Sequence, residues 1–108
     1  QDYGRAVELL TRALNQDNKW GIVYLAKAYF NGLGVQKDYV RARTLLEKVT
    51  WVNEEAYYML GVIYGRGLGV SRDVKKGVEY LQKAGGRQEA REELSRYRKT
   101  LFGKWVRR

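Results

Sequence analysis

The sequence predicts an all-α fold in which helix pairs stack into a solenoid, and three observations lead to this prediction. Residues 25–35 recur as residues 60–70, so the chain repeats itself with a period of 35 residues. Residues 2–6 align with residues 38–42, which indicates a third, truncated copy. Within each period a glycine-rich loop separates two stretches of helical spacing, and the chain contains no proline. Such a fixed period is typical of stacked helical repeats, which are usually binding surfaces rather than catalysts.

The first helix of each period is here called helix A, and in the second repeat it is expected over about residues 54–65. Ala56, Leu60 and Tyr64 recur there every four residues, which places them on one face of a helix. Gly61 weakens an isolated helix by about 1 kcal/mol relative to alanine. A small residue at this position in both repeats therefore predicts that another helix crosses closely.

The glycine clusters at residues 31–35 and 65–70 are expected to connect helix A to the second helix, helix B. Gly32 and Gly67 come just after helix A, where a left-handed backbone favours glycine. A Gly-x-Gly string also occurs in phosphate-binding loops, but the rest of that fingerprint is missing. Because the loop occurs twice, we interpret it as a structural connection rather than a nucleotide site.

An aspartate begins each expected helix B, namely Asp38 and Asp73, with Asp2 at the same place in the truncated copy. An aspartate at this position accepts a hydrogen bond from a free backbone N–H and complements the helix dipole. The regular spacing favours capping over a catalytic role. Core positions follow at helical spacing: Ala6, Leu9, Leu10 and Ala13; Ala42, Leu45, Leu46 and Val49; Gly77, Tyr80, Leu81 and Ala84.

We expect a single repeat domain over residues 1–108 with about six helices. Its parts in chain order are helix B of a truncated repeat at 2–14, a repeat at 19–49, a repeat at 54–84, a degenerate third helix A or cap at 87–99, and a basic tail at 100–108. Two and a half repeats bury a limited core and expose apolar ends. The chain is therefore expected to be part of a longer array, or to have an end covered by a partner or by a second copy.

The composition excludes several kinds of site. Histidine and cysteine are absent, which rules out Cys/His metal sites, Ser-His-Asp triads and cysteine nucleophiles. The formal net charge of +9 favours an acidic protein, nucleic acid or anionic lipid as partner, although a solvated basic surface without a specific partner explains it equally well. No apolar run approaches the ~20 residues of a membrane span, and no signal peptide is visible. Because the sequence starts at Gln1, we expect a processed form, and the absence of cysteine suits a bacterial protein of the cytoplasm or periplasm.

The second repeat carries the motif Ala56-x-x-x-Leu60-Gly61-x-x-Tyr64-x-x-Gly67-x-Gly69-Val70-x-x-Asp73, closing on Leu81-Gln82-Lys83-Ala84. This pattern resembles the Sel1-like repeat, a relative of the tetratricopeptide repeat with a longer, glycine-marked loop. The resemblance covers residues 2–84 closely and 85–99 weakly. Departures from the pattern occur at Gly21, Ala26, Val49 and Gly77. The resemblance implies antiparallel helix pairs in a right-handed superhelix, with A helices on a concave face that binds peptides or partner helices. It implies no catalytic residue and no cofactor.

Helical geometry places a second set of side chains on this inner face if Ala56, Leu60 and Tyr64 face the core. The set combines large aromatic side chains with arginine and lysine, and aromatic residues and arginine dominate binding energy at interfaces. Its members are Trp20, Val23, Lys27, Phe30, Asn31, Glu55, Tyr58, Val62, Arg66 and Arg96, with Glu89 and Glu92 beside the last. The alternative for the aromatic members is packing against neighbouring helices.

The C-terminal segment is a second candidate for partner binding. Residues 85–108 contain eight basic and three acidic residues, a net charge of +5. This segment combines positive charge with aromatic residues, which suits anionic lipid, nucleic acid or an acidic protein. Its candidate residues are Arg98, Lys99, Lys104, Trp105, Arg107 and Arg108. The alternative is a solvated tail whose apolar residues cover the end of the last repeat.

The sequence therefore predicts a protein-interaction module, an adaptor or scaffold that binds a partner with an acidic segment on its concave face. A bacterial inhibitor or immunity-type protein that blocks an effector is one version of this function. Binding to nucleic acid or anionic lipid is the alternative that the charge suggests. Catalysis is not expected, because the adjacent pairs Glu54–Glu55 and Glu92–Glu93 point in different directions on a helix and cannot cooperate as acid and base.

Overall fold

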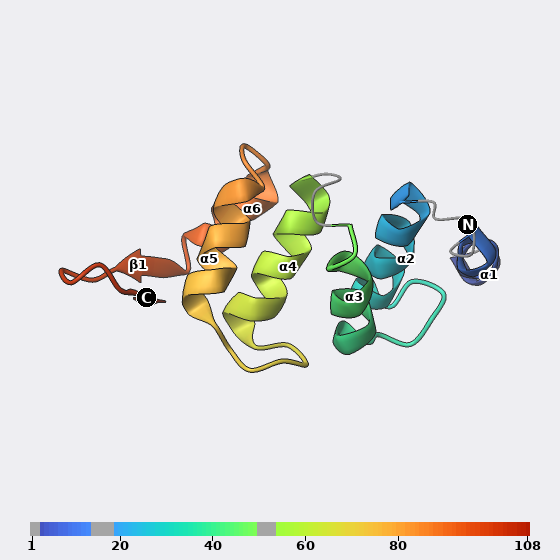
Figure 1. Cartoon of the computed structure of the whole chain (residues 1–108), viewed down its shortest axis with the longest axis horizontal. Coiled ribbons are helices and arrows are strands. Elements are labelled where there is room, and N and C mark those ends of the chain that lie inside the picture. The colour runs from blue at the N-terminus through green and yellow to red at the C-terminus, as the bar shows by residue number, and fades with distance from the viewer. Residues whose placement is uncertain (1–2, 14–18, 50–53) are drawn as a thin grey trace. The chain divides into compact units, whose positions relative to one another are not determined.

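The computed structural model describes residues 3–13, 19–49 and 54–108 of the 108-residue chain. The chain forms two compact units, Gln1–Val52 and Asn53–Arg108. Figure 1 shows helices in both units and a short two-stranded sheet in the second. None of the helices in the described part of the chain has the length and hydropathy that a membrane span requires.

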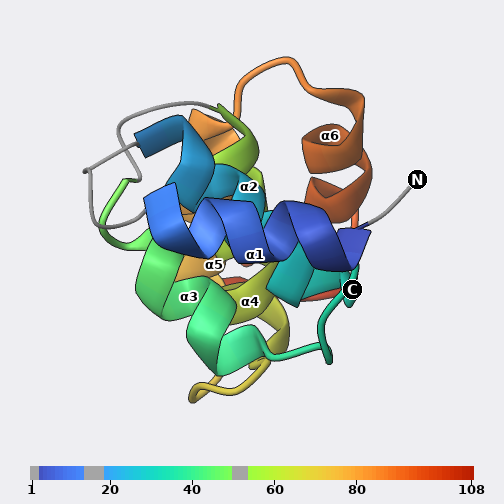
Figure 2. The same ribbon diagram turned by 90° about the vertical axis from the view of Figure 1, so that its right-hand side faces the viewer.

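The first unit contains α1 (Tyr3–Ala13), α2 (Lys19–Asn31) and α3 (Tyr39–Leu46), and both α1 and α3 pack against α2 (Figure 2). Asp38 caps α3 as predicted, because its carboxylate accepts the Arg41 N–H at 3.0 Å. The predicted core positions of α3 are all buried, as are the facing residues of α2: Ala42, Leu45, Leu46 and Val49; Ile22, Leu25 and Ala26.

The prediction for α1 needs one correction. Leu9 was expected in the core but is 54% exposed. It corresponds to Leu45 of α3, which is buried, so the position in the repeat does not by itself determine burial; burial depends on the elements that pack beside the helix. Among the α1 side chains that the structure describes, Val7 is buried. Asp2 and the side chains of Ala6, Leu10 and Ala13 lie outside the described part of the chain.

The second unit contains α4 (Glu54–Arg66), α5 (Val74–Lys83) and α6 (Gln88–Leu94), followed by β1 (Tyr97–Lys99) and β2 (Trp105–Arg107). The strands pair antiparallel. The predicted core residues of α5 are buried except for one half-buried tyrosine: Gly77, Leu81 and Ala84 are buried, and Tyr80 is half-buried.

Helices α4 and α5 cross closely at glycines, as the sequence predicted for Gly61. A Cβ atom at Gly61 would lie 2.6 Å from Cγ of Leu81, and one at Gly77 would lie 2.6 Å from Cα of Gly65. A side chain at Gly61 would require the Leu81 side chain to shift, and one at Gly77 would require the backbone of α4 to move. The glycines therefore set the distance between α4 and α5.

The C-terminal segment differs from the prediction of a helix to residue 99. α6 ends at Leu94, and the next residues form a hairpin rather than a further helical turn. Tyr97 is buried in the core of the second unit with Val78 and Leu81, and Trp105 packs against the same cluster. This burial, together with Gly103 at a φ of 83° in the turn, favours the hairpin over the helix.

Candidate functional site

The predicted inner-face residues of the first unit differ in their exposure. Trp20 is exposed, whereas Val23 is only 3% exposed. The prediction that Val23 faces a partner is therefore wrong, because its aliphatic side chain packs in the core. Phe30 is half-buried and meets Tyr39 edge to face at 5.6 Å, so part of its ring packs within the unit. Lys27 is half-buried and Asn31 is exposed, with its side-chain amide bonded to the Lys27 carbonyl.

The predicted inner-face residues of the second unit also separate into buried and accessible ones. Val62 is only 4% exposed and cannot offer its side chain to a partner, which corrects the prediction. Tyr58 is half-buried and packs against the core cluster. Glu55 is half-buried and lies 3.8 Å from Arg87. Arg66 is the predicted residue with the most specific contacts.

Arg66 forms a two-point ion pair with Glu93 of α6. Its Nε donates to Oε2 at 2.8 Å and its Nη2 donates to Oε1 at 2.7 Å. Glu93 is 6% exposed, and Arg96 adds a longer contact of 3.8 Å. The hydrogen bonds that Arg66 donates to Glu93 raise the pKa of Arg66 despite partial burial. The pair links α4 to α6, and the charges of Arg66 and Glu93 compensate each other.

The ionised pair also influences two tyrosines. Burial raises the pKa of Tyr58 and of Tyr97, and the negative charge of Glu93 raises both further. The sequence analysis treated Glu93 only as a neighbour of Glu92. Its position three residues after the core residue Ala90 was the available signal, since residues at that spacing share a helix face.

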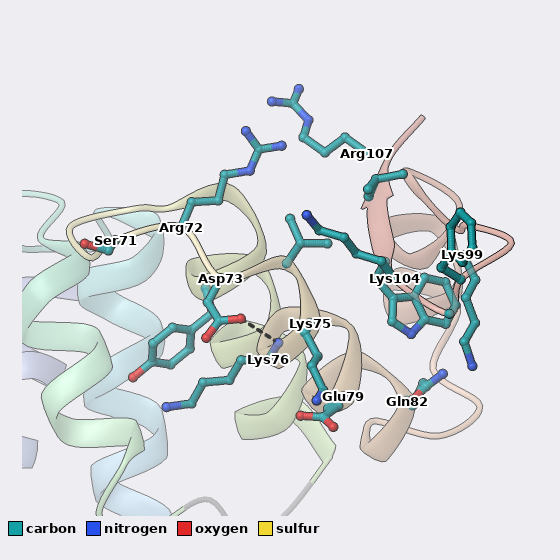
Figure 3. A pocket seen from close by; sticks show the side chains of 16 residues that line it. Ser71, Arg72, Asp73, Lys75, Lys76, Glu79, Gln82, Lys99, Lys104 and Arg107 are labelled. Atoms are coloured by element: carbon teal, nitrogen blue, oxygen red, sulfur yellow. Dashed lines mark hydrogen bonds between the residues drawn. The ribbon is translucent and has the colours of Figure 1, made fainter.

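A groove of about 1050 Å³ lies in the second unit, between the hairpin and the start of α5 (Figure 3). Six basic side chains line it: Arg72, Lys75, Lys76, Lys99, Lys104 and Arg107. Two acidic residues also line it, Asp73 and Glu79, so the lining carries a net charge of +4. In Figure 3, Arg72 and Lys104 approach from opposite walls, the loop before α5 and the hairpin.

The basic side chains of the groove are not neutralised within the unit. Over residues 3–13, 19–49 and 54–108, none of the six forms an ion pair. Lys76 instead lies over the ring of Tyr64, with Nζ 4.3 Å from the ring centre. Asp73 is occupied as the cap of α5, where it accepts the Lys76 N–H at 3.0 Å. The groove therefore offers uncompensated positive charge beside aromatic surface.

The groove brings together part of the predicted basic tail. Lys99, Lys104, Trp105 and Arg107 line it, whereas Arg98 and Arg108 do not.

The sequence analysis missed the other wall of the groove, which residues 71–76 form. Three of these residues are basic, and their density was the signal that a count of local charge would have found. Among the described residues, no group of three acidic side chains is arranged to hold a metal ion.

The comparisons identify the repeats. The family model described as Sel1 repeat matches residues 1–18, 21–48 and 54–85. The Sel1-repeat-containing protein YjcO of Escherichia coli is 32% identical over 88 residues, which cover 77% of this chain and 38% of YjcO. The ERAD-associated E3 ubiquitin-protein ligase component HRD3B of Arabidopsis thaliana is 35% identical over 75 residues, which cover 59% of this chain and 12% of HRD3B. The chain thus spans well under half of either relative.

Solved structures share the fold. The protective antigen c5321 of uropathogenic Escherichia coli, which displays an SLR fold, aligns with a TM-score of 0.78 at 24% identity over 87% of this chain and 21% of its own. A Sel1 repeat protein from Oxalobacter formigenes aligns with a TM-score of 0.69 at 24% identity over 84% of this chain and 38% of its own. Sel1 repeats form helical solenoids, generally mediate contacts between proteins and are typically scaffolds rather than enzymes. Since the family model matches most of its residues, the chain belongs to the Sel1-repeat family.

Proposed function

We propose that this chain is a protein-interaction module that holds an acidic segment of a partner protein in the groove between α5 and the hairpin. The observation that carries the proposal is the set of six basic side chains around the groove, none of which has an ion-pair partner among the residues described. Uncompensated charge of one sign attracts an oppositely charged partner over several ångströms and orients it on approach.

The walls of the groove also suit a peptide better than a simple ion. Phe102 and Trp105 contribute aromatic surface beside the cations. A peptide with acidic and apolar side chains would use both, and aromatic and arginine contacts carry much of the energy at protein interfaces. The name of the Arabidopsis relative, a component of a ubiquitin ligase, supports a role within a protein assembly.

The inner-face side of the A helices, considered in each unit by itself, is the second candidate surface for the same function. Exposed Trp20 and half-buried Tyr58 favour it, because large aromatic residues anchor many interfaces. Two features weaken it. Val23 and Val62 are buried, and the charge of Arg66 is already compensated by Glu93.

Fluorescence anisotropy with a labelled glutamate-rich peptide tests the groove. Lys75→Glu/Lys104→Glu reverses two charges in the groove, and we expect it to weaken binding at least about tenfold. Arg91→Glu/Arg98→Glu is the matched control, because both residues are exposed, lie outside the groove and change the net charge equally. The control should bind like the natural chain within about twofold.

Two outcomes would contradict the proposal that the peptide binds in the groove. Equal loss in both charge-reversal variants would mean that only the net charge matters. Loss in Trp20→Ser or Tyr58→Ala, with the groove variant unaffected, would move binding to the inner face. Affinity capture with the same variants, followed by mass spectrometry, would then identify a partner whose retention follows one surface.

A further inference from the structure

We propose that the tip of the C-terminal hairpin, Leu101 and Phe102, inserts into the interface of a membrane that contains anionic lipid. This surface overlaps the peptide groove at Phe102 and Lys104, whereas Leu101 lies outside the groove. The inference goes beyond the proposed protein-binding function and does not depend on it.

The turn that carries the two residues is well defined. The Thr100 N–H donates to the Lys104 carbonyl at 2.7 Å, and the Gly103 N–H donates to the Thr100 carbonyl at 2.9 Å. The Thr100 hydroxyl also accepts the Lys104 N–H at 3.0 Å. These bonds close the turn and direct Leu101 and Phe102 away from the hairpin.

The two apolar side chains at the tip are fully exposed, at 102% for Leu101 and 98% for Phe102. Other aromatic residues of the same hairpin behave differently: Tyr97 is buried in the core and Trp105 packs against it. The base of the hairpin is therefore anchored, and the tip projects from the second unit (Figure 1). A fixed turn that presents adjacent large apolar residues to solvent indicates an interaction site.

The charges around the tip indicate what it meets. Residues 94–108 contain six basic residues and no acidic one. Arg98, Lys99 and Lys104 lie within three positions of the apolar pair. In a membrane interface, long basic side chains reach the lipid phosphates while apolar side chains reach the acyl boundary. This arrangement matches the order of charge and apolarity across an anionic leaflet.

The shape of the tip favours lipid over a protein as its partner. A protein would need a pocket for a convex pair of side chains, and the small area of such a contact falls well below the ~1,200 Å² of a stable protein interface. A lipid interface adapts to a projecting tip and also offers charge complementarity to all the flanking basic residues. We therefore commit to anionic lipid as the occupant.

Vesicle co-sedimentation tests the inference with the full chain at physiological ionic strength. Vesicles of phosphatidylcholine are compared with vesicles that also contain phosphatidylserine. We expect binding only to the second kind. Leu101→Ser should weaken it at least about tenfold, because the apolar contribution to interfacial binding is lost. Lys104→Gln should weaken it about fivefold through the loss of one charge.

Leu9→Ser is the matched control, since Leu9 is an exposed leucine of α1 far from the hairpin in sequence. It should leave vesicle binding unchanged. Because Leu101 does not line the groove, Leu101→Ser should also leave binding of the glutamate-rich peptide unchanged. The two proposals thus fail independently.

Three results would overturn the inference. Absence of vesicle binding at physiological ionic strength would exclude the membrane as partner. Binding that depends on Lys104 but not on Leu101 would show adsorption by charge without insertion. Binding of a single-stranded oligonucleotide that requires Phe102, without vesicle binding, would reassign the tip to nucleic acid, where aromatic side chains stack on bases.

Discussion

The two complete repeats of this chain, α2–α3 and α4–α5, build the same backbone and differ in what they pack against. In the first, the Leu33 N–H donates to the Ala28 carbonyl at 2.8 Å; in the second, the equivalent Leu68 N–H donates to Ile63 at 2.9 Å. Asp38 and Asp73 cap their helices at the same distance of 3.0 Å. The glycine loops therefore fix one geometry twice, independently of the residues around them.

A cation over a tyrosine ring is also repeated. The Arg41 guanidinium lies 5.2 Å from the ring centre of Tyr29, and the Lys76 ammonium lies 4.3 Å from that of Tyr64. In the first repeat Arg41 also donates to the Tyr29 hydroxyl at 3.1 Å, a bond that raises the pKa of Arg41. The second repeat replaces arginine by lysine, whose ammonium lies closer to the ring and lines the basic groove.

The differences concentrate at the helix crossing. Phe30 of the first repeat corresponds to Gly65 of the second, and Asn31 corresponds to Arg66. A Cβ at Gly65 would collide with the Tyr97 hydroxyl, so glycine leaves the space that this tyrosine fills. Arg66 then reaches Glu93. The second repeat is thus modified to hold α6 and the hairpin, and the hairpin in turn creates the groove.

The largest expected effect comes from restoring in the second repeat a side chain that the first repeat has. Gly77 corresponds to Ala42, but a Cβ at Gly77 would lie 2.6 Å from backbone atoms of Gly65, which cannot rotate away. Overpacking costs about 1–3 kcal/mol and occasionally more, and the helix propensity of alanine returns about 1 kcal/mol. Because the clash is with backbone atoms, we take the upper end of this range and expect Gly77→Ala to lower the free energy of unfolding by about 2 kcal/mol, measured by urea denaturation.

Gly86→Ala is the control, because a Cβ there meets no atom within 4 Å. Its free energy of unfolding should stay within about 0.5 kcal/mol of the natural chain. A stabilised Gly77→Ala variant would mean that α4 and α5 are no closer than α2 and α3, and the comparison would lose its basis.

A smaller effect is expected from the ion pair that the second repeat alone carries. Arg66→Met leaves the buried Glu93 with only the longer contact to Arg96. Breaking a fully buried pair costs about 3–5 kcal/mol, but the Arg66 side chain is 40% exposed. Solvent screening reduces our expectation to about 1.5 kcal/mol. The double variant Arg66→Met/Glu93→Leu should recover most of this loss in urea denaturation.

The equivalent residue of the first repeat supplies the control. Asn31→Ala removes only an exposed side-chain bond to the Lys27 carbonyl and should cost less than about 0.5 kcal/mol. If Arg66→Met costs no more than Asn31→Ala, the pair does not hold α6, and the difference between the repeats must come from the glycines alone.

The two caps should give equal effects, since their geometry is equal. Asp38→Ala and Asp73→Ala are each expected to lower the free energy of unfolding by about 1 kcal/mol.

The effects of Asp38→Ala and Asp73→Ala on peptide binding should differ, because Asp73 is one of two carboxylates in the groove and Asp38 is not. Asp73→Ala should therefore bind the glutamate-rich peptide more tightly. Equal affinity of both variants would argue against peptide binding in the groove.

Sequence periodicity predicted most of the helical architecture because each repeat is specified locally. The capping aspartates, the loop glycines and the buried stripe of α3 all follow from residues close in sequence. The prediction that Leu9 lies in the core was wrong, because the burial of this residue depends on a neighbouring helix and no local pattern reports such a neighbour. The same reason applies to Val23 and Val62, whose burial distinguishes core from surface only after the helices are packed.

The hairpin and the groove were less accessible to prediction. Tyr97 and Trp105 occur among basic residues that also suit a helix or a solvated tail, and only their fit against the core selects strands. The tail residues Lys99, Lys104 and Arg107 were predicted as basic candidates. The opposite wall of the groove, around Lys75, was not predicted, because nothing in the sequence shows that the hairpin returns to the start of α5.

The smallest effect is confined to alkaline solution and concerns Tyr97, which has no counterpart in the first repeat. Burial and the charge of Glu93 raise its pKa in the folded chain above the value of about 10 for an unfolded chain. Its contribution is therefore fully present below pH ~10 and is lost as the pH rises through the folded value, since the unfolded state ionises first. Tyr97→Phe should flatten the fall in melting temperature above pH ~10, whereas Tyr24→Phe, at an exposed site, should not. If Tyr97→Phe leaves the alkaline fall in melting temperature unchanged, the pKa of Tyr97 is not raised in the folded chain. The hairpin would then open before the repeats unfold.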